Sequence, residues 1–230
     1  MFKNLLSFWK GKDFLSKVLN EFEQMMINAE GMFKAVCEKL ITGKGKEGLG
    51  DRIYEIDRQI NQFERDIRKR IIEHLALQPS VDVPVCLVLM SVVKDAERLG
   101  DYAKNLFEVT EMMKGPMDKE LFRSYFNEAD KKLILLAEKT RSAFIKSDEA
   151  LAREILGIER EIVVKCEEAI KKLANGNLSS NLSVCFTLIA RYFKRIAAHL
   201  VNIGSSVIVP IDQLDFFDES ERQKNMKSTS

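Results

Sequence analysis

The sequence predicts an all-α protein of six long helices, arranged as two pseudo-symmetric three-helix bundles. Apolar residues recur every three or four positions along most of the chain, which is the period of an amphipathic helix. Only four prolines occur in 230 residues, each at a point where such a segment should begin or end. In addition, two segments of the first half recur in the second half, and internal repetition is typical of stacked helical units.

Three helices are expected in the first half, over about 12–42, 50–77 and 83–113. The glycine-rich segment 43–50 separates the first two helices, and Gln78-Pro79 ends the second. This segment lacks the spacing of a phosphate-binding P-loop, so we interpret it as a helix–helix linker.

Three further helices are expected over about 118–145, 148–174 and 180–208. Gly115-Pro116 breaks the chain before them, and Asp118 is placed to cap the fourth helix. The last helix ends before Pro210. The predicted division is therefore a first unit, a second unit and a polar C-terminal tail, over residues 1–114, 115–210 and 211–230.

The repeat that supports this division is visible in two matches. The segment IYEIDRQI at 53–60 matches ILGIEREI at 155–162. The segment KDAERLGDYAKN at 94–105 matches RYFKRIAAHLVN at 191–202. Since each three-helix unit alone would leave one apolar face bare, we expect the two units to pack against each other.

The copies differ in charge, because Glu97 and Asp101 of the first copy correspond to Lys194 and Ala198 of the second. Like charges one helical turn apart repel by about 0.2–0.5 kcal/mol, so a compensating cation is expected. Carboxylate and amide oxygens hold hard cations, which suggests a metal ion of the iron, zinc or magnesium class. The candidate ligands from the two facing helices are Asp57, Asn61, Glu97 and Asp101. The alternative is a charge network of Glu97, Arg98 and Asp101 without a metal.

No catalytic arrangement is recognisable from spacing. Neither His74 nor His199 follows a Glu by three residues, as a di-iron carboxylate bundle would require. We expect His74 at a helix end and His199 partly buried, facing the other unit. The four cysteines lack metal-binding spacing, so we expect buried, reduced thiols and a cytoplasmic protein.

Charge and hydropathy limit the classes of partner. The 36 basic residues are balanced by 35 acidic ones, and this net charge of +1 argues against a nucleic-acid binder. No stretch is apolar enough for a membrane span. The apolar side chains within residues 2–9 either attach the protein peripherally to a membrane or fold back against the bundle.

Two motifs point to a known family. ERLGDYAKN at 97–105 resembles the ERIGD-x-x-x-N core of PhoU-family proteins, and ARYFKRIAAHLVNI at 190–203 resembles the variant that this family repeats near its C-terminus. QPSVD at 78–82 is similar to a shortened form of the family's QPVASDLR. The N-terminus also resembles the related accessory family that accompanies Pit-type phosphate permeases, and the two branches stay open.

The resemblance implies a cytoplasmic, non-enzymatic regulator or accessory protein of phosphate transport. It implies a metal at Glu97 and Asp101, with Asp57 and Asn61 opposite, on the first unit only. The implied partner is a membrane phosphate transporter or its sensor kinase, with self-assembly into a homo-oligomer and no role for nucleic acid. Two alternatives stay open: a carboxylate-bound metalloenzyme acting on a phosphate or oxygen substrate, and a purely structural bundle.

Overall fold

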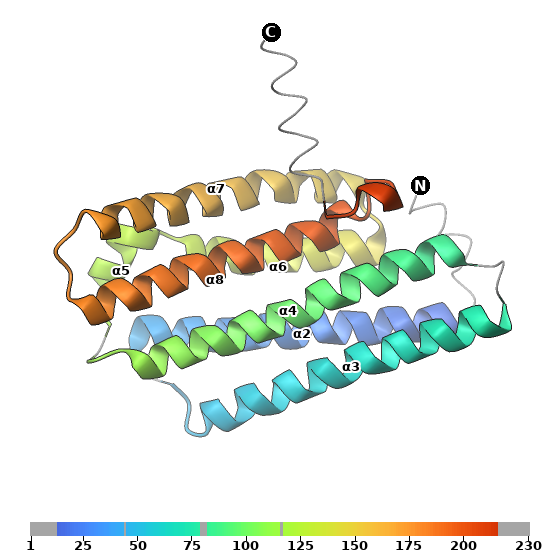
Figure 1. Ribbon diagram of the computed structural model, residues 1–230, viewed down its shortest axis with the longest axis horizontal. Helices are drawn as coiled ribbons and strands as arrows, with labels where there is room; N and C mark the ends of the chain where they lie inside the picture. Colours follow the sequence, from blue (N-terminus) through green and yellow to red (C-terminus); the bar gives the residue numbers. More distant parts are fainter. Residues whose placement is uncertain (1–12, 44, 79–81, 116, 216–230) are drawn as a thin grey trace, which may run out of the picture.

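The computed structural model describes residues 13–43, 45–78, 82–115 and 117–215, and within these ranges it is helical and contains no strand (Figure 1). The all-α prediction is confirmed. Five long helices lie close to the predicted bounds: α2 (Asp13–Thr42), α3 (Leu49–Leu77), α4 (Val83–Met112), α7 (Glu149–Ala174) and α8 (Ser180–Ser205). A sixth, α6 (Ala129–Lys146), ends as predicted but begins later. A short helix α5 (Lys119–Phe126) and a single helical turn η1 (Ile211–Gln213) complete the described fold. The apolar N-terminal segment and the tail from residue 216 lie outside the described residues.

The single helix expected over 118–145 is wrong, because two helices, α5 and α6, occupy this range. The break falls at Asn127, whose φ of 49° is positive, as Asn tolerates more readily than most residues. The Arg123 guanidinium holds the corner by bonding the Asn127 carbonyl oxygen at 2.5 Å and the buried carboxylate of Asp130. This tertiary contact is invisible in the helical periodicity.

Capping side chains set the start of three helices in the second half. Asp118 caps α5 as predicted, since its carboxylate accepts two hydrogen bonds from backbone N–H groups of the first turn, at 2.8 and 3.1 Å. Asp148 and Ser179 each accept one such hydrogen bond, at the starts of α7 and α8. Each cap satisfies N–H groups that have no partner within the helix, which fixes the start locally.

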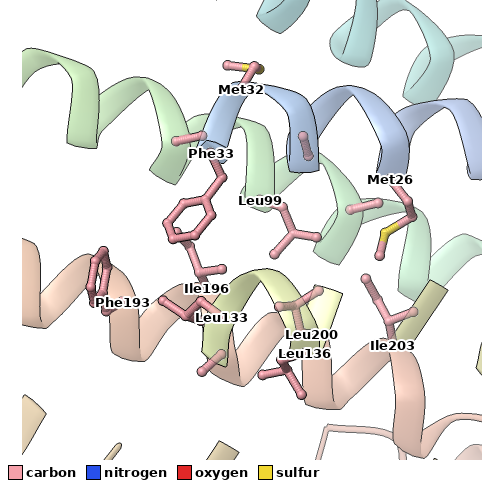
Figure 2. Packing of buried hydrophobic residues seen from close by; sticks show 14 of the residues in the cluster. Met26, Met32, Phe33, Leu99, Leu133, Leu136, Phe193, Ile196, Leu200 and Ile203 are labelled. Carbon is pink, nitrogen blue, oxygen red and sulfur yellow. The ribbon is translucent and has the colours of Figure 1, made fainter. Parts of the chain in front are cut away.

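The two halves pack through α2, α4, α6 and α8, while α3 and α7 lie on the outer sides (Figure 1). Side chains of all four inner helices meet at this interface (Figure 2). The Phe33 and Phe193 rings, for example, lie 5.8 Å apart in an edge-to-face arrangement. Each fully buried large apolar side chain contributes about 1.5–3 kcal/mol, so the interface is a main part of the core. The interface residues labelled in Figure 2 include Met26, Leu99, Leu133, Leu136, Ile196 and Leu200.

Contacts between α4 and α8 follow the internal repeat. Tyr102 of α4 corresponds to His199 of α8, and these two rings stack with centroids 5.6 Å apart. Asp95 corresponds in the same match to Tyr192; Asp95 contacts His199, while the Tyr192 ring lies 5.8 Å from Tyr102. Equivalent positions thus make equivalent contacts, as a pseudo-twofold axis between α4 and α8 requires.

All four cysteines are buried and free, as predicted. Burial raises the pKa of the Cys86 thiol to about 11 and that of Cys166 to about 12, so the reactive thiolate is disfavoured. His74 lies in the last turn of α3, also as predicted, with its Nε2 2.6 Å from Asp82 Oδ2. Within the described ranges, no helix is long and apolar enough to cross a membrane.

Candidate functional site

The candidate site lies on α4, which α3 flanks on one side and α8 on the other. Gly100 of α4 permits a close approach of α3, because a Cβ at this position would lie only 2.8 Å from Ile60 Cδ1. The approach brings Asp57, about one turn before Ile60, to face α4. The polar side chains of α4 therefore lie between two packed helices and are partly shielded from water.

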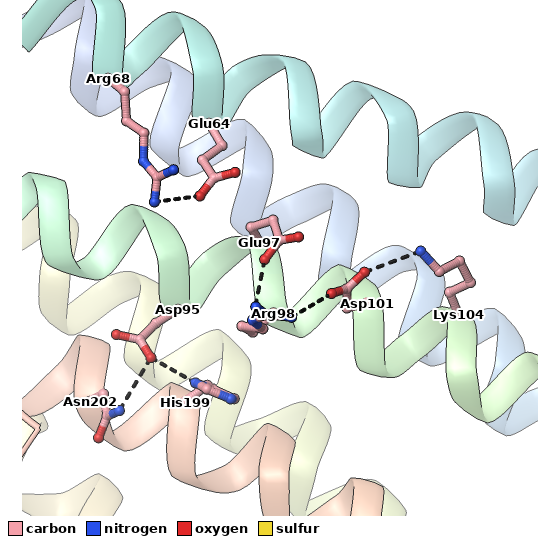
Figure 3. A network of polar contacts seen from close by, with 9 residues as sticks. All are labelled: Glu64, Arg68, Asp95, Glu97, Arg98, Asp101, Lys104, His199 and Asn202. Carbon is pink, nitrogen blue, oxygen red and sulfur yellow. Dashed lines mark hydrogen bonds and ion pairs between the residues drawn. The ribbon is translucent and has the colours of Figure 1, made fainter.

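A cation of the chain itself lies between two of the predicted metal ligands. The Lys104 ammonium donates hydrogen bonds to Asp57 Oδ2 at 2.9 Å and to Asp101 Oδ1 at 3.1 Å. Arg98 donates from Nη1 to the other oxygen of Asp101 at 3.0 Å, and its Nε lies 3.6 Å from Glu97 Oε2 (Figure 3). These five side chains of α3 and α4 form what we call the first-unit network: Asp57, Glu97, Arg98, Asp101 and Lys104.

Burial contributes to the pKa shifts of one basic and one acidic side chain in this network, Lys104 and Glu97. Burial opposes the charge on Lys104, but the hydrogen bonds that the ammonium donates to Asp57 and Asp101, with the attraction of these carboxylates, outweigh it and raise the pKa of Lys104. Burial also raises the pKa of Glu97, and repulsion from Asp101 adds to this shift more than Arg98 offsets it. Glu97 is therefore the carboxylate in the network that further positive charge would stabilise most clearly.

The predicted metal ligands are only partly assembled. Asn61 lies one turn after Asp57 on α3 and is half-buried. Across the described part of the chain, no three His, Cys, Asp or Glu side chains are arranged so that they could hold a metal ion. Both oxygens of Asp101 and one of Asp57 already accept hydrogen bonds from Lys104 and Arg98. A metal ion at the predicted position would therefore have to replace Lys104.

The corresponding face of the second unit has different chemistry. Lys194, Ala198 and Val201 of α8 stand where α4 carries the acidic pair and Lys104. Lys194 instead donates to Glu167 Oε1 of α7 at 2.6 Å. The carboxylate pair bridged by a lysine is thus a property of the first unit.

A second polar cluster joins the two units. Asp95 of α4 is buried, and its Oδ1 lies 2.7 Å from His199 Nδ1 and accepts a hydrogen bond from Asn202 Nδ2 at 3.2 Å (Figure 3). The prediction that His199 faces the other unit is confirmed, but the sequence analysis did not single out Asp95. One signal was available: Asp95 lies at helical spacing from Val92 and Leu99, and so falls on the core-facing side of α4.

Comparison with known proteins identifies relatives of this chain. A PhoU domain model matches residues 22–110 and 126–207, which cover most of both halves. A phosphate-specific transport system accessory protein PhoU homolog from Pseudomonas aeruginosa is 27% identical over 173 residues, covering 70% of this chain and 69% of the relative. The PhoU homolog 1 of Thermotoga maritima is 25% identical over 174 residues, covering 70% and 72%.

Solved structures show the same fold. The crystal structure of PhoU from Pseudomonas aeruginosa aligns with a TM-score of 0.73 at 23% identity, covering 85% of this chain and 95% of that one. The phosphate transport system regulatory protein PhoU from Streptococcus pneumoniae aligns with a TM-score of 0.74 at 18% identity, covering 84% and 93%. At such low sequence identity, these structural similarities support a shared fold and nothing further.

Proposed function

Because this chain belongs to the PhoU family, we propose that it is a non-enzymatic regulator or accessory protein of phosphate transport. The observation that carries the proposal is the match of the family model to both units. Two relatives that cover most of this chain are named as accessory proteins of phosphate-specific transport systems, which supports the same role. The protein would act by binding rather than by chemistry.

The partner in this proposal is a membrane phosphate transporter or its sensor kinase, reached from the cytoplasm. The first-unit network is the surface we assign to this regulation, because it holds several partly buried charges that a ligand or a partner can rearrange. Such charge networks are sensitive to an added cation or anion at close range. Self-association into a homo-oligomer stays a prediction, which light scattering of the purified protein checks.

We also propose that a hard cation of the iron, zinc or magnesium class can exchange with the Lys104 ammonium. Asp57 and Asp101 would then provide oxygen ligands, with Glu97 and Asn61 beside them. The raised pKa of Glu97 supports the proposal, because added positive charge would favour its ionised form.

The exchange is tested by comparing the metal content and metal affinity of the wild type and Lys104→Met. The variant should bind metal more tightly, since the competing ammonium is gone, and adding Asp101→Asn should reverse the gain. If both the wild type and Lys104→Met contain negligible metal, the proposal is wrong and this face holds a charge network without a metal site.

The regulatory role is tested by deleting the gene and measuring phosphate uptake and phosphate-starvation gene expression in scarce and abundant phosphate. We expect at least one of the two to lose its normal dependence on phosphate. Removing the Pst-type or the Pit-type transporter in the deletion strain then shows which branch the protein serves, because only the relevant removal should suppress the defect. Unchanged uptake and expression in both media would contradict the role.

A further inference from the structure

A groove with a volume of about 440 Å³ lies between α2 and α3 of the first unit. Its lining comes from α2, α3 and the linker between them, and it includes none of the five residues of the first-unit network. Apolar side chains dominate the lining: Ile27, Met32, Ala35, Leu49, Ile53 and Ile56. The groove thus offers an apolar surface on the outside of the bundle.

Gly31 keeps this groove open. No atom lies within 4 Å of the position where a Cβ would stand at Gly31, and the neighbouring Ile27 is 40% exposed despite its apolar side chain. A Cβ at Gly31 would therefore meet no clash, and a longer side chain at this lining position has room to extend into the groove.

The position equivalent to Gly31 in the second unit carries a larger side chain. The buried positions of α6 repeat the spacing of those of α2, with Leu133 and Leu136 matching Ala29 and Met32. In this alignment Leu135 stands at the position of Gly31.

Charge pairing differs as well. In the alignment of α6 with α2, Lys139 stands where the first unit has Ala35. The match of 155–162 with 53–60 places Glu154 where the first unit has Arg52. Lys139 Nζ donates to Glu154 Oε1 at 2.7 Å and so links α6 to α7. In the first unit, Ala35 cannot form that link.

The rim of the groove carries excess positive charge. Lys34, Lys46 and Arg52 line it against one acid, Glu38. Lys34 already pairs with acids outside the groove, at 2.6 and 2.8 Å. Arg52 and Lys46 form no ion pair with another residue of the described ranges. Their charges are therefore available to an anion.

We propose that this groove binds a soluble organic anion that carries a short alkyl chain. The chain would lie on the apolar side chains of α2 and α3, and the anionic group, a phosphate or a carboxylate, would bond the Arg52 guanidinium and the Lys46 ammonium. Guanidinium groups bind such anions through two parallel hydrogen bonds. The volume lies within the range of about 300–1,000 Å³ that is usual for small-molecule sites. The inference is independent of the role in phosphate transport.

Calorimetric titration of the full-length protein with octyl phosphate below its micellar concentration tests the site. We expect saturable one-to-one binding, and at least about tenfold weaker binding of inorganic phosphate and of octanol, because each lacks one half of the ligand. Gly31→Leu should abolish the binding, and Arg52→Glu should weaken it by at least about tenfold.

Gly157→Leu is the matched control, because Gly157 is a helical glycine of the second unit with equally open space around its Cβ position. This variant should fold and bind octyl phosphate like the wild type. Octyl phosphate binding that survives Gly31→Leu, or binding seen only with phosphatidylglycerol vesicles, would overturn the proposal. Absence of saturable binding to the wild type would do the same.

Discussion

The matching faces of α4 and α8 belong to the same repeated helical segment but carry different polar side chains. On α4, Lys104 joins two carboxylates, Asp57 of α3 and Asp101 of α4 itself. On α8, Lys194 makes one contact with Glu167. The apolar positions of the repeat are retained, since they build the core, whereas the positions of Glu97, Asp101 and Lys104 differ. The fold therefore constrains the core of each copy and leaves its charged face free to acquire a separate role.

The ion pairs of Lys104 and Lys194 also differ in their exposure to solvent. The Lys104 and Asp57 side chains are 20% and 10% exposed, whereas those of Lys194 and Glu167 are 29% and 49% exposed. A buried charge without its partner is costly, while an exposed pair contributes little. This contrast predicts different effects for equivalent substitutions in the two units.

Lys104→Ala is the substitution expected to have the largest effect. It should lower the free energy of unfolding by about 2–3 kcal/mol, because Asp57 would remain partly buried without a cation and Asp101 would keep only Arg98. Lys194→Ala, the same substitution at a more exposed ion pair of the second unit, should cost at most about 1 kcal/mol. Urea denaturation followed by circular dichroism measures both, and equal losses would remove the contrast between the two faces.

The pseudo-twofold contacts between the units provide the next comparison. A double-mutant cycle of Asp95→Ala and His199→Ala should give a coupling energy of about 1–2 kcal/mol, because either substitution removes the contact between the two side chains and leaves buried Asp95 with Asn202 alone when His199 is lost. The symmetry-related ring pair, tested with Tyr102→Ala and Tyr192→Ala, should give about 0.5 kcal/mol. A larger coupling for the ring pair would mean that Asp95 and His199 do not hold the interface.

Glu97→Gln should have the smallest effect and the opposite sign. Removing the repulsion with Asp101 should raise the free energy of unfolding by about 0.2–0.5 kcal/mol at neutral pH. The folded state raises the pKa of Glu97 above its usual 4.5, so the folded protein favours the protonated acid and loses stability as the pH rises above that value. The gain from Glu97→Gln should therefore be larger at pH 8 than at pH 4. A loss of stability at pH 8 would show that the Glu97 charge is favourable.

Much of the fold followed from local sequence signals. Periodicity located the long helices, and the Asp118 cap and the two-unit repeat were both recognisable before the structure. The division of the fourth helix was not, because Arg123 reaches Asp130 only once the corner exists. Local signals therefore locate helices but not the tertiary contacts that interrupt them.

The candidate site was predictable in composition but not in arrangement. Spacing placed Glu97 and Asp101 on one face, and the repeat showed that the second unit lacks them. Spacing did not show that Lys104 would span from Asp101 to Asp57, since this depends on how closely α3 approaches α4 at Gly100. The pairing of charges across helices is thus a property of packing.

We propose that the polar face of the first unit carries the regulatory role. The most direct test of this proposal is complementation of the deletion strain with Glu97→Gln plus Asp101→Asn, with Lys194→Ala as the second-unit control and immunoblots to match protein levels. Phosphate uptake and a phosphate-starvation reporter are measured in scarce and abundant phosphate. The account predicts that Lys194→Ala restores normal regulation and that the double variant does not. Full restoration by the double variant would contradict it.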